Sequence, residues 1–179
     1  MRRRRTEPIK DEDRVIKDAA KARERTMHRA VRLLAAKPRS VGELRTRLME
    51  KAWTNLEIVD AVIEKLQEYG YLDDAKYAEG LANAKLREKP QGRRRLKWTM
   101  SRKELDPETV DQAIDSAYEK MPEEELADLA IEKRVRLKGV PKTREDLKKF
   151  YDHLMRQGFS YGMIRDKVAA LPRAQDEDE

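Results

Sequence analysis

Residues 40–66 read SVGELRTRLMEKAWTNLEIVDAVIEKL, and this stretch decides the fold class. Apolar residues recur in it one helical turn apart on both sides of a short break at Trp53–Asn55, which predicts two amphipathic helices joined by a turn. Ser40 and Glu43 form a capping-box pattern at the start of the first helix. Gly70 follows the second helix, at a position past the C-terminus where glycine is favoured.

The same apolar pattern occurs three times along the chain. Each copy has two apolar residues one turn apart, a bulky apolar residue at the turn, and two more apolar residues one turn apart. The spacings are 4, 5, 5 and 4 residues, and the copies are offset by 52 and 54 residues. The positions are Leu44, Leu48, Trp53, Ile58 and Val62; Leu96, Met100, Leu105, Val110 and Ile114; and Phe150, Leu154, Phe159, Ile164 and Val168.

A further helix is expected before each pair: from about Arg23 to Ala36, from Asp74 to about Glu88, and from after Pro122 to near Gly139. No segment has the alternating pattern of a strand. The sequence therefore predicts an all-α fold, an elongated, right- or left-curved array of three tandem three-helix, helix-turn-helix-like repeats. The expected parts are a basic tail with a leading helix (1–22), repeat 1 (23–72), repeat 2 (73–121), repeat 3 (122–172) and an acidic tail (173–179).

The composition of the 179-residue chain fits thin helical layers better than one deep core, because 42% of the residues are charged and only 6% are aromatic. The net charge of +6 indicates either an anionic partner such as nucleic acid or a solvated, salt-bridged surface. The absence of cysteine excludes disulfides and thiolate sites. No apolar stretch approaches the ~20 residues of a membrane span. Arg2–Arg5 lack the apolar region of a secretory signal behind them, so we expect a cytoplasmic protein.

The sequence offers little catalytic chemistry. His28 and His153 lie in different repeats with no motif around either, and each is interpreted as a surface or packing residue. Asp73 and Asp74 are better explained as N-cap and dipole partners at a helix start than as cation ligands. The glycines match neither a phosphate loop nor a dinucleotide fingerprint. We therefore expect a protein that is not an enzyme and that has no catalytic residues, cofactor or metal.

Basic residues cluster around the second helix of the middle repeat. Three arginines at a helix start oppose the helix dipole, so stability alone does not explain them, whereas contact with phosphates or acidic patches does. The candidate partner- and DNA-binding residues are Lys85, Arg87, Lys89, Arg93, Arg94, Arg95, Lys97 and Trp98, an aromatic outside the apolar pattern. Later basic clusters over 133–138 and 142–149 are interpreted as solvated surface.

Trp53 is interpreted as a core residue. It shares the turn position of the apolar pattern with Leu105 and Phe159. An aliphatic residue at that position in one copy favours core packing over the stacking of nucleic-acid bases.

The segment from Ser40 to Lys85 resembles the RecX family of bacterial regulatory proteins. Its Ser-x-x-Glu-Leu start stands at 40–44, and the more specific Gly-x-Leu-Asp-Asp-x-x-Tyr-Ala motif stands at 70–78. The three-repeat organisation extends the resemblance over roughly residues 24–171. The chain departs from the family pattern in the middle repeat, where Thr99–Met100 and Lys103–Glu104 replace a Glu-Leu pair and a Lys-Gly turn.

The resemblance implies a negative regulator of RecA that lies along the groove of the RecA–DNA filament. Such a protein inhibits filament extension, ATP hydrolysis, strand exchange and coprotease activity, in DNA repair, homologous recombination and the SOS response. The expected partners are the RecA recombinase filament and DNA phosphates, single-stranded or weakly duplex, with no membrane partner. The chain is expected to be a monomer.

Two other interpretations stay open from the sequence. A helix-turn-helix-like module could bind DNA without RecA, since three-helix units of about 50 residues suit it. No unit, however, combines Arg, Asn and Gln on one face of a recognition helix. A scaffold of helical repeats that binds an unrelated protein is the other interpretation.

Overall fold

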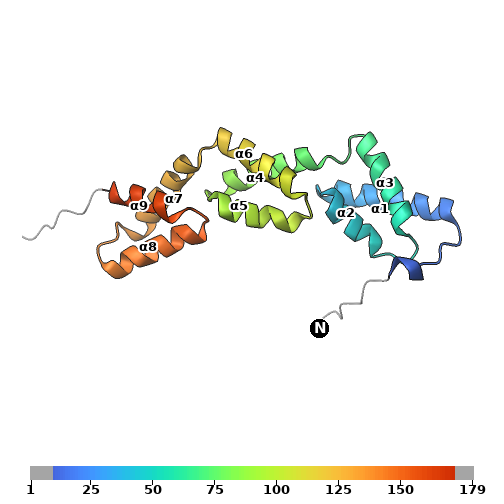
Figure 1. Ribbon diagram of the computed structural model, residues 1–179, viewed down its shortest axis with the longest axis horizontal. Coiled ribbons are helices and arrows are strands. Elements are labelled where there is room, and N and C mark those ends of the chain that lie inside the picture. The colour runs from blue at the N-terminus through green and yellow to red at the C-terminus, as the bar shows by residue number, and fades with distance from the viewer. Residues whose placement is uncertain (1–9, 172–179) are drawn as a thin grey trace, which may run out of the picture. The chain divides into compact units, whose positions relative to one another are not determined.

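The computed structural model describes residues 10–171, and this part of the chain is helical without any strand, as the sequence predicted (Figure 1). It holds nine α-helices and two short 3-10 helices. The α-helices are α1 (Ala19–Ala36), α2 (Val41–Met49), α3 (Leu56–Glu68), α4 (Asp74–Glu88), α5 (Arg93–Met100), α6 (Pro107–Lys120), α7 (Glu123–Lys138), α8 (Arg144–Arg156) and α9 (Tyr161–Ala169). The 3-10 helices are η1 (Asp11–Asp13) and η2 (Ser101–Lys103). The predicted basic run Arg2–Arg5 and the acidic tail 173–179 lie outside the described residues.

Capping side chains set where several of the helices begin. The predicted capping box is confirmed: the Ser40 hydroxyl accepts a hydrogen bond from the Glu43 backbone at 3.0 Å, and the Glu43 carboxylate accepts one from the Ser40 backbone. The start expected for α1 near Arg23 was wrong. The helix begins at Ala19 because the Asp18 carboxylate accepts a hydrogen bond from the first turn and caps it there.

The described chain divides into two compact units. Unit 1 holds the residues up to Tyr77 together with Lys103–Leu105, and unit 2 holds Ala78–Arg102 and the residues from Asp106 onward. Lys103–Leu105 belongs to unit 1 because the Ser40 hydroxyl donates to the Lys103 carbonyl at 2.5 Å, and the Lys103 ammonium lies 3.2 Å from the Glu43 carboxylate. The predicted repeat boundaries near residues 72 and 121 stay predictions.

The core of unit 1 lies among α1, α2 and α3. It is made of buried aliphatic side chains: Ala30, Leu44, Leu48, Val59, Val62, Ile63, Leu66 and Leu72. Burying this apolar surface is the main source of stability for such a small unit.

Unit 2 has a comparable buried set along α4–α9. The largest of its fully buried side chains are Leu86, Leu96, Met100, Leu154, Phe159 and Ile164. Gly92 lies against Gly158 so closely that a Cβ added to either would collide with its surroundings, and Gly158 has a φ of +96°. Glycine is therefore required at both positions for α5 to meet the α8–α9 turn.

The apolar pattern of the sequence predicts the core well. Of its fifteen positions, thirteen are buried, and the two half-buried exceptions are Trp53 and Val168. The prediction that Trp53 is a core residue was wrong, whereas Phe159 and Leu105 at the matching positions are buried at 1% and 9% exposure.

The Gly-x-Leu-Asp-Asp-x-x-Tyr-Ala segment has a physical function in unit 1. Gly70 ends α3 in a left-handed conformation, with φ +73°. Asp73 accepts a hydrogen bond from the Lys76 backbone at 2.9 Å, which confirms it as a helix cap. Asp74 caps a different helix, because its carboxylate accepts from the first backbone N–H of α2, at Val41 (2.8 Å). The motif therefore ties the start of α4 to α2.

Candidate partner-binding surfaces

The three arginines at the start of α5 meet acids that the sequence did not reveal. The Glu123 carboxylate accepts a hydrogen bond from the Arg93 backbone N–H at 2.9 Å and therefore places a negative charge at the helix N-terminus. The Arg93 guanidinium also pairs with Asp115 and lies 4.8 Å from the centre of the Tyr118 ring. Burial and the nearby Glu123 raise the pKa of Tyr118. The unfavourable dipole that motivated a functional interpretation is thus offset within the fold.

The other basic residues of α5 differ in how far they are engaged. Arg95 donates to the Arg156 carbonyl at 2.8 Å, and the Lys97 ammonium lies 2.6 Å from the Asp111 carboxylate. Arg94 is exposed and makes no ion pair or hydrogen bond with another described residue.

The residues before and after this run complete the predicted surface. Lys85 pairs with Glu88 at 2.7 Å, whereas Arg87 and Lys89 are exposed and their side chains have no ion-pair partner within residues 10–171. Trp98 is 60% exposed, and the Arg102 guanidinium lies 5.0 Å from its ring centre. We call the set Lys85, Arg87, Lys89, Arg93, Arg94, Arg95, Lys97 and Trp98 the α5 surface.

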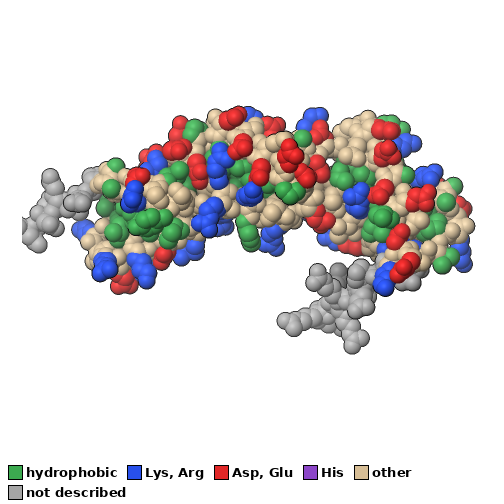
Figure 2. Space-filling view, in the orientation of Figure 1, with side chains coloured by type: hydrophobic (Ala, Val, Ile, Leu, Met, Phe, Trp, Pro, Cys, Tyr) green, Lys and Arg blue, Asp and Glu red, His purple; other side chains and the backbone are tan. Residues whose placement is uncertain are grey.

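The α5 surface is less positive than its sequence indicated. In Figure 2, acidic and basic side chains are interspersed over the α4–α6 part of the molecule. Exposed ion pairs of this kind contribute little stability, about 0–1 kcal/mol each, so the paired cations stay available to a stronger anionic partner. The features left for recognition are the exposed Trp98 and three cations without an ion-pair partner in the described part of the chain, Arg87, Lys89 and Arg94.

A small basic hollow lies elsewhere in unit 2. It has a volume of about 130 Å³ and is lined by Lys89, Lys133, Arg134, His153 and Gln157, with Pro90, Ala130 and Leu137. Burial, and then the positive charges of Arg134, Arg156 and Lys89, lower the pKa of His153. Part of the basic cluster at 133–138, interpreted as plain solvated surface, therefore shapes a local electrostatic environment.

The sequence interpretation missed a larger basic groove in unit 1. It has a volume of about 580 Å³ and lies along α1 beside the α2–α3 turn. We call it the α1 groove, and its lining residues are Lys21, Glu24, Arg25, His28, Arg29, Arg32, Lys51 and Trp53. The available signal was the spacing of Lys21, Arg25, Arg29 and Arg32 at helical intervals, which places them on one helix face.

Within residues 10–171, no group of three or more His, Cys, Asp or Glu side chains is placed to hold a metal ion. None of the helices described there is long and apolar enough to cross a bilayer.

Models of three RecX domains match the chain in order. The model of the first three-helix domain matches residues 27–66, that of the second matches 73–114, and that of the third matches 122–168. Together they cover most of the chain, including α5 and the greater part of α1.

Named relatives and solved structures agree with these matches. A regulatory protein RecX from Lactococcus lactis is 29% identical over 83% of this chain. The matched part spans 56% of that protein's length. One from Chlorobium phaeobacteroides is 28% identical over 81% of this chain and 92% of its own length. The crystal structure of RecX from Lactobacillus salivarius superposes with a TM-score of 0.73 at 21% identity, over 84% of this chain and 96% of that one. The chain therefore belongs to the RecX family.

Proposed function

We propose that this chain is a negative regulator of a RecA recombinase, which binds the RecA–DNA filament and inhibits its extension, ATP hydrolysis, strand exchange and coprotease activity. Membership of the RecX family carries the proposal, because its relatives are named as regulatory proteins. In this proposal the chain acts by binding, as a cytoplasmic monomer, and needs no catalytic residue, cofactor or metal of its own.

The α5 surface supports a binding role. Trp and Arg are enriched among the residues that contribute most binding energy in protein interfaces. Here the exposed Trp98 ring lies beside Arg102, while Arg94 lacks a partner among the described residues. A surface with an apolar ring and unpaired cations fits an acidic or phosphate-bearing face of the filament.

The decisive experiment measures ssDNA-dependent ATP hydrolysis by RecA while the chain is titrated in below equimolar ratio. Strong inhibition at substoichiometric amounts is expected. The combined variant Arg94→Glu and Trp98→Ala should need at least 10-fold more protein for half-inhibition. Its matched control is Arg136→Glu with Leu137→Ala, another exposed basic–apolar pair, on α7. Equal inhibition by both variants would remove the α5 surface from the proposal, and no inhibition by the unaltered chain would end the recombinase proposal itself.

The α1 groove favours one second candidate, a DNA-binding module that acts without RecA. It predicts tight DNA binding by the chain alone, with a steep dependence on salt. If ATP hydrolysis is unaffected while the chain binds DNA tightly, this second function takes the place of the first.

A further inference from the structure

The α1 groove carries a row of cations along one face of α1. Lys21, Arg25, Arg29 and Arg32 follow one another at intervals of four, four and three residues, so their side chains share a face over about 16 Å at the helical rise of ~1.5 Å per residue. Lys51 adds a further cation from the α2–α3 turn. A linear row of positive charge suits a linear polyanion better than a compact ligand.

Few acidic side chains lie beside these cations. Arg29 contacts Glu50 at 3.5 Å, and Glu24 is the one acid that lines the groove. The side chains of Lys21, Arg32 and Lys51 make no ion pair or hydrogen bond with another described residue. The lining therefore keeps a clear positive excess.

An aromatic ring lies beside the cations. Trp53 is half-buried, and the Arg25 guanidinium lies 4.6 Å from the centre of its ring. Arginine and tryptophan stacked in this way offer flat faces to an unpaired base, and stacking of this kind accepts any base. Duplex DNA keeps its bases stacked inside and offers no such face, so the ring favours a single strand.

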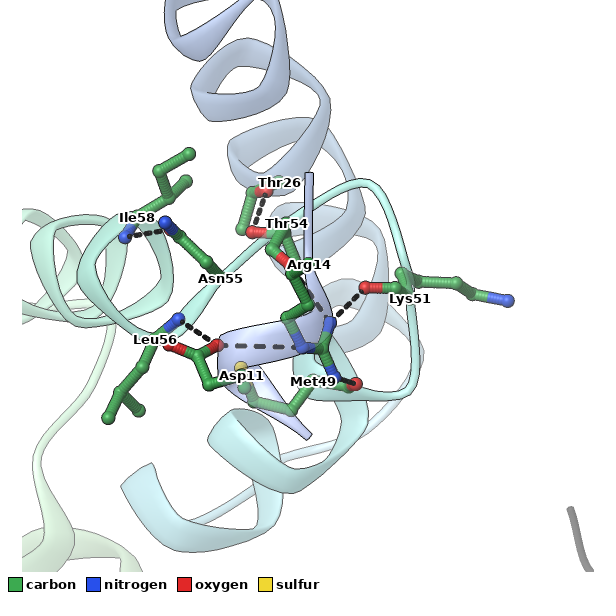
Figure 3. Close-up of polar contacts among 9 residues, drawn as sticks. All are labelled: Asp11, Arg14, Thr26, Met49, Lys51, Thr54, Asn55, Leu56 and Ile58. Atoms are coloured by element: carbon green, nitrogen blue, oxygen red, sulfur yellow. Dashed lines mark hydrogen bonds and ion pairs between the residues drawn. The ribbon is translucent and has the colours of Figure 1, made fainter. Parts of the chain in front are cut away.

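Polar contacts hold the turn that carries Lys51 and Trp53 (Figure 3). The Arg14 guanidinium donates to the backbone carbonyls of Met49 (2.6 Å), Lys51 (2.6 Å) and Thr54 (2.8 Å), and its side chain is 2% exposed. The Asp11 carboxylate, 3.5 Å from Arg14, accepts from the Leu56 backbone at the start of α3.

The same turn is also joined to α1. The Thr26 hydroxyl lies 2.9 Å from that of Thr54, and both residues are fully buried. Residues 10–26, which include Arg14 and Thr26, lie before the segment matched by the first RecX domain model. This leading segment thus fixes one wall of the groove relative to the other.

We propose that the α1 groove binds single-stranded nucleic acid, with the α1 cations on successive phosphates and Trp53 stacked on a base. The inference deepens the proposed function, because it assigns the contact with the DNA strand to α1 and leaves the α5 surface for the recombinase. Charge, length and the ring each point to this occupant, whereas an acidic peptide would leave the partly exposed Trp53 ring without a base to stack on.

The test uses the whole chain with Trp98→Phe, so that Trp53 is its one tryptophan, and an oligonucleotide of deoxythymidine as the probe. Binding should quench Trp53 fluorescence, and the logarithm of the binding constant should fall with the logarithm of salt with a slope of roughly −2, for about three phosphates. Reversal of three cations (Lys21→Glu, Arg25→Glu, Arg32→Glu) should weaken binding at least 10-fold and flatten the slope.

Two controls separate this site from general charge. Arg136→Glu, Lys142→Glu and Lys148→Glu make the same change in net charge at exposed positions of unit 2 outside both surfaces, and should leave the affinity within about 3-fold. Trp53→Leu copies the leucine found at the matching position 105 and should weaken binding about 5-fold or more, since an apolar side chain remains but the aromatic ring is lost. Because the charged groove positions Lys21, Arg25 and Arg32 are exposed, the thermal midpoint of the triple variant should stay close to that of the unaltered chain.

Trp53 fluorescence that is not quenched by the oligonucleotide, or equal losses of affinity in the two triple-reversal variants, would overturn the proposed binding site in the groove. Failure of the groove is distinguishable from failure of the proposed function. A chain that inhibits RecA but binds no oligonucleotide retains the proposed function and loses the groove. A chain that binds the oligonucleotide through α1 but leaves RecA unaffected retains the groove and loses the proposed function.

Discussion

Helices α1 and α5 are both rich in arginine and lysine, yet the fold treats their charges differently. Along α5, Arg93 meets Asp115 and Glu123, and Lys97 meets Asp111. Along α1, the Arg29–Glu50 pair is the one contact between a groove cation and an acid within the described residues, and Arg25 stacks on a ring. The arginines of α5, the densest run in the described sequence, are therefore the more neutralised. The more widely spaced cations of α1 remain more available to a partner.

The difference teaches that positive charge in a sequence stays available to a partner where the fold places few acids beside it. On α5 the acids come from α6 and α7, more than ten residues away along the chain. On α1 the neighbouring turn supplies Lys51 and Trp53 instead. Four predictions test this contrast, with tryptophan fluorescence of Trp98→Phe reporting on unit 1 and that of Trp53→Phe reporting on unit 2.

The largest effect is expected from Arg14→Ala, compared with Arg93→Ala. Arg14 donates to three carbonyls of the turn beside α1, so its loss should lower the free energy of unfolding of unit 1 by about 2–4 kcal/mol. Arg93 is a half-exposed ion-pair partner, and its loss should cost unit 2 below about 1 kcal/mol. Urea unfolding of both variants with the two tryptophan reporters measures this. Similar losses of unfolding free energy in the two variants would show that Arg14 and Arg93 contribute equally to the stability of their units.

The second effect is a gain of binding at α5. Asp111→Asn, Asp115→Asn and Glu123→Gln together remove the acids that face the α5 cations, while the new amide at position 123 retains an acceptor for the Arg93 N–H. In the background of the three α1 reversals, affinity for the deoxythymidine oligonucleotide should rise about 3- to 10-fold.

The control neutralises three acids of unit 2 that are exposed and unpaired within the described residues: Glu119, Glu125 and Glu132. It should raise the affinity less than the α5-facing set does. An equal rise would show that net charge, not local pairing, governs binding.

A smaller, pH-dependent effect is expected in unit 2. Burial and the neighbouring cations lower the pKa of His153 below its ordinary value of 6.5, so the unfolded state binds the proton more readily than the folded state. His153 therefore stabilises unit 2 above pH 6.5 and loses that contribution as the pH falls through its folded-state pKa. His153→Gln should make the unfolding midpoint of unit 2 depend less on pH between pH 7.5 and about pH 5.5. The matched variant His28→Gln, in unit 1, should leave the pH profile of unit 2 as it was, and a profile unchanged by His153→Gln would contradict the assignment.

The smallest effect is expected at Glu104, just after α5 and η2 along the chain. Among the described non-glycine residues only Glu104 has a positive φ, at +52°, and its carboxylate accepts from the Thr46 hydroxyl at 2.6 Å. Glu104→Gly removes a backbone cost of about 1 kcal/mol. It also loses that hydrogen bond and adds freedom to the unfolded chain. The stability of unit 1 should thus change by less than about 0.5 kcal/mol, with no change in unit 2. The contrasting variant Gly70→Ala, at φ +73°, should lower the stability of unit 1 by about 1 kcal/mol. If Glu104→Gly changed only the unfolding reported by Trp98, residue 104 would belong to unit 2 and not to unit 1.

The sequence by itself determined the helices and most of the core. Periodicity and caps are local properties, so the apolar pattern from Leu44 to Val168 placed thirteen of fifteen side chains in the interior, and Ser40 and Asp73 were identified as caps. Family membership was likewise readable from the motif at Gly70–Ala78.

Only the tertiary structure decided which polar groups meet. The carboxylate of Asp74 caps α2 across 33 residues, and Arg14 holds a turn 35 to 40 residues away. Trp53 was assigned to the core, yet the groove beside α1 keeps its ring half-exposed. Apolar burial follows a period along one helix, whereas the pairing of a charge depends on which distant segment packs beside it, and no local pattern encodes that.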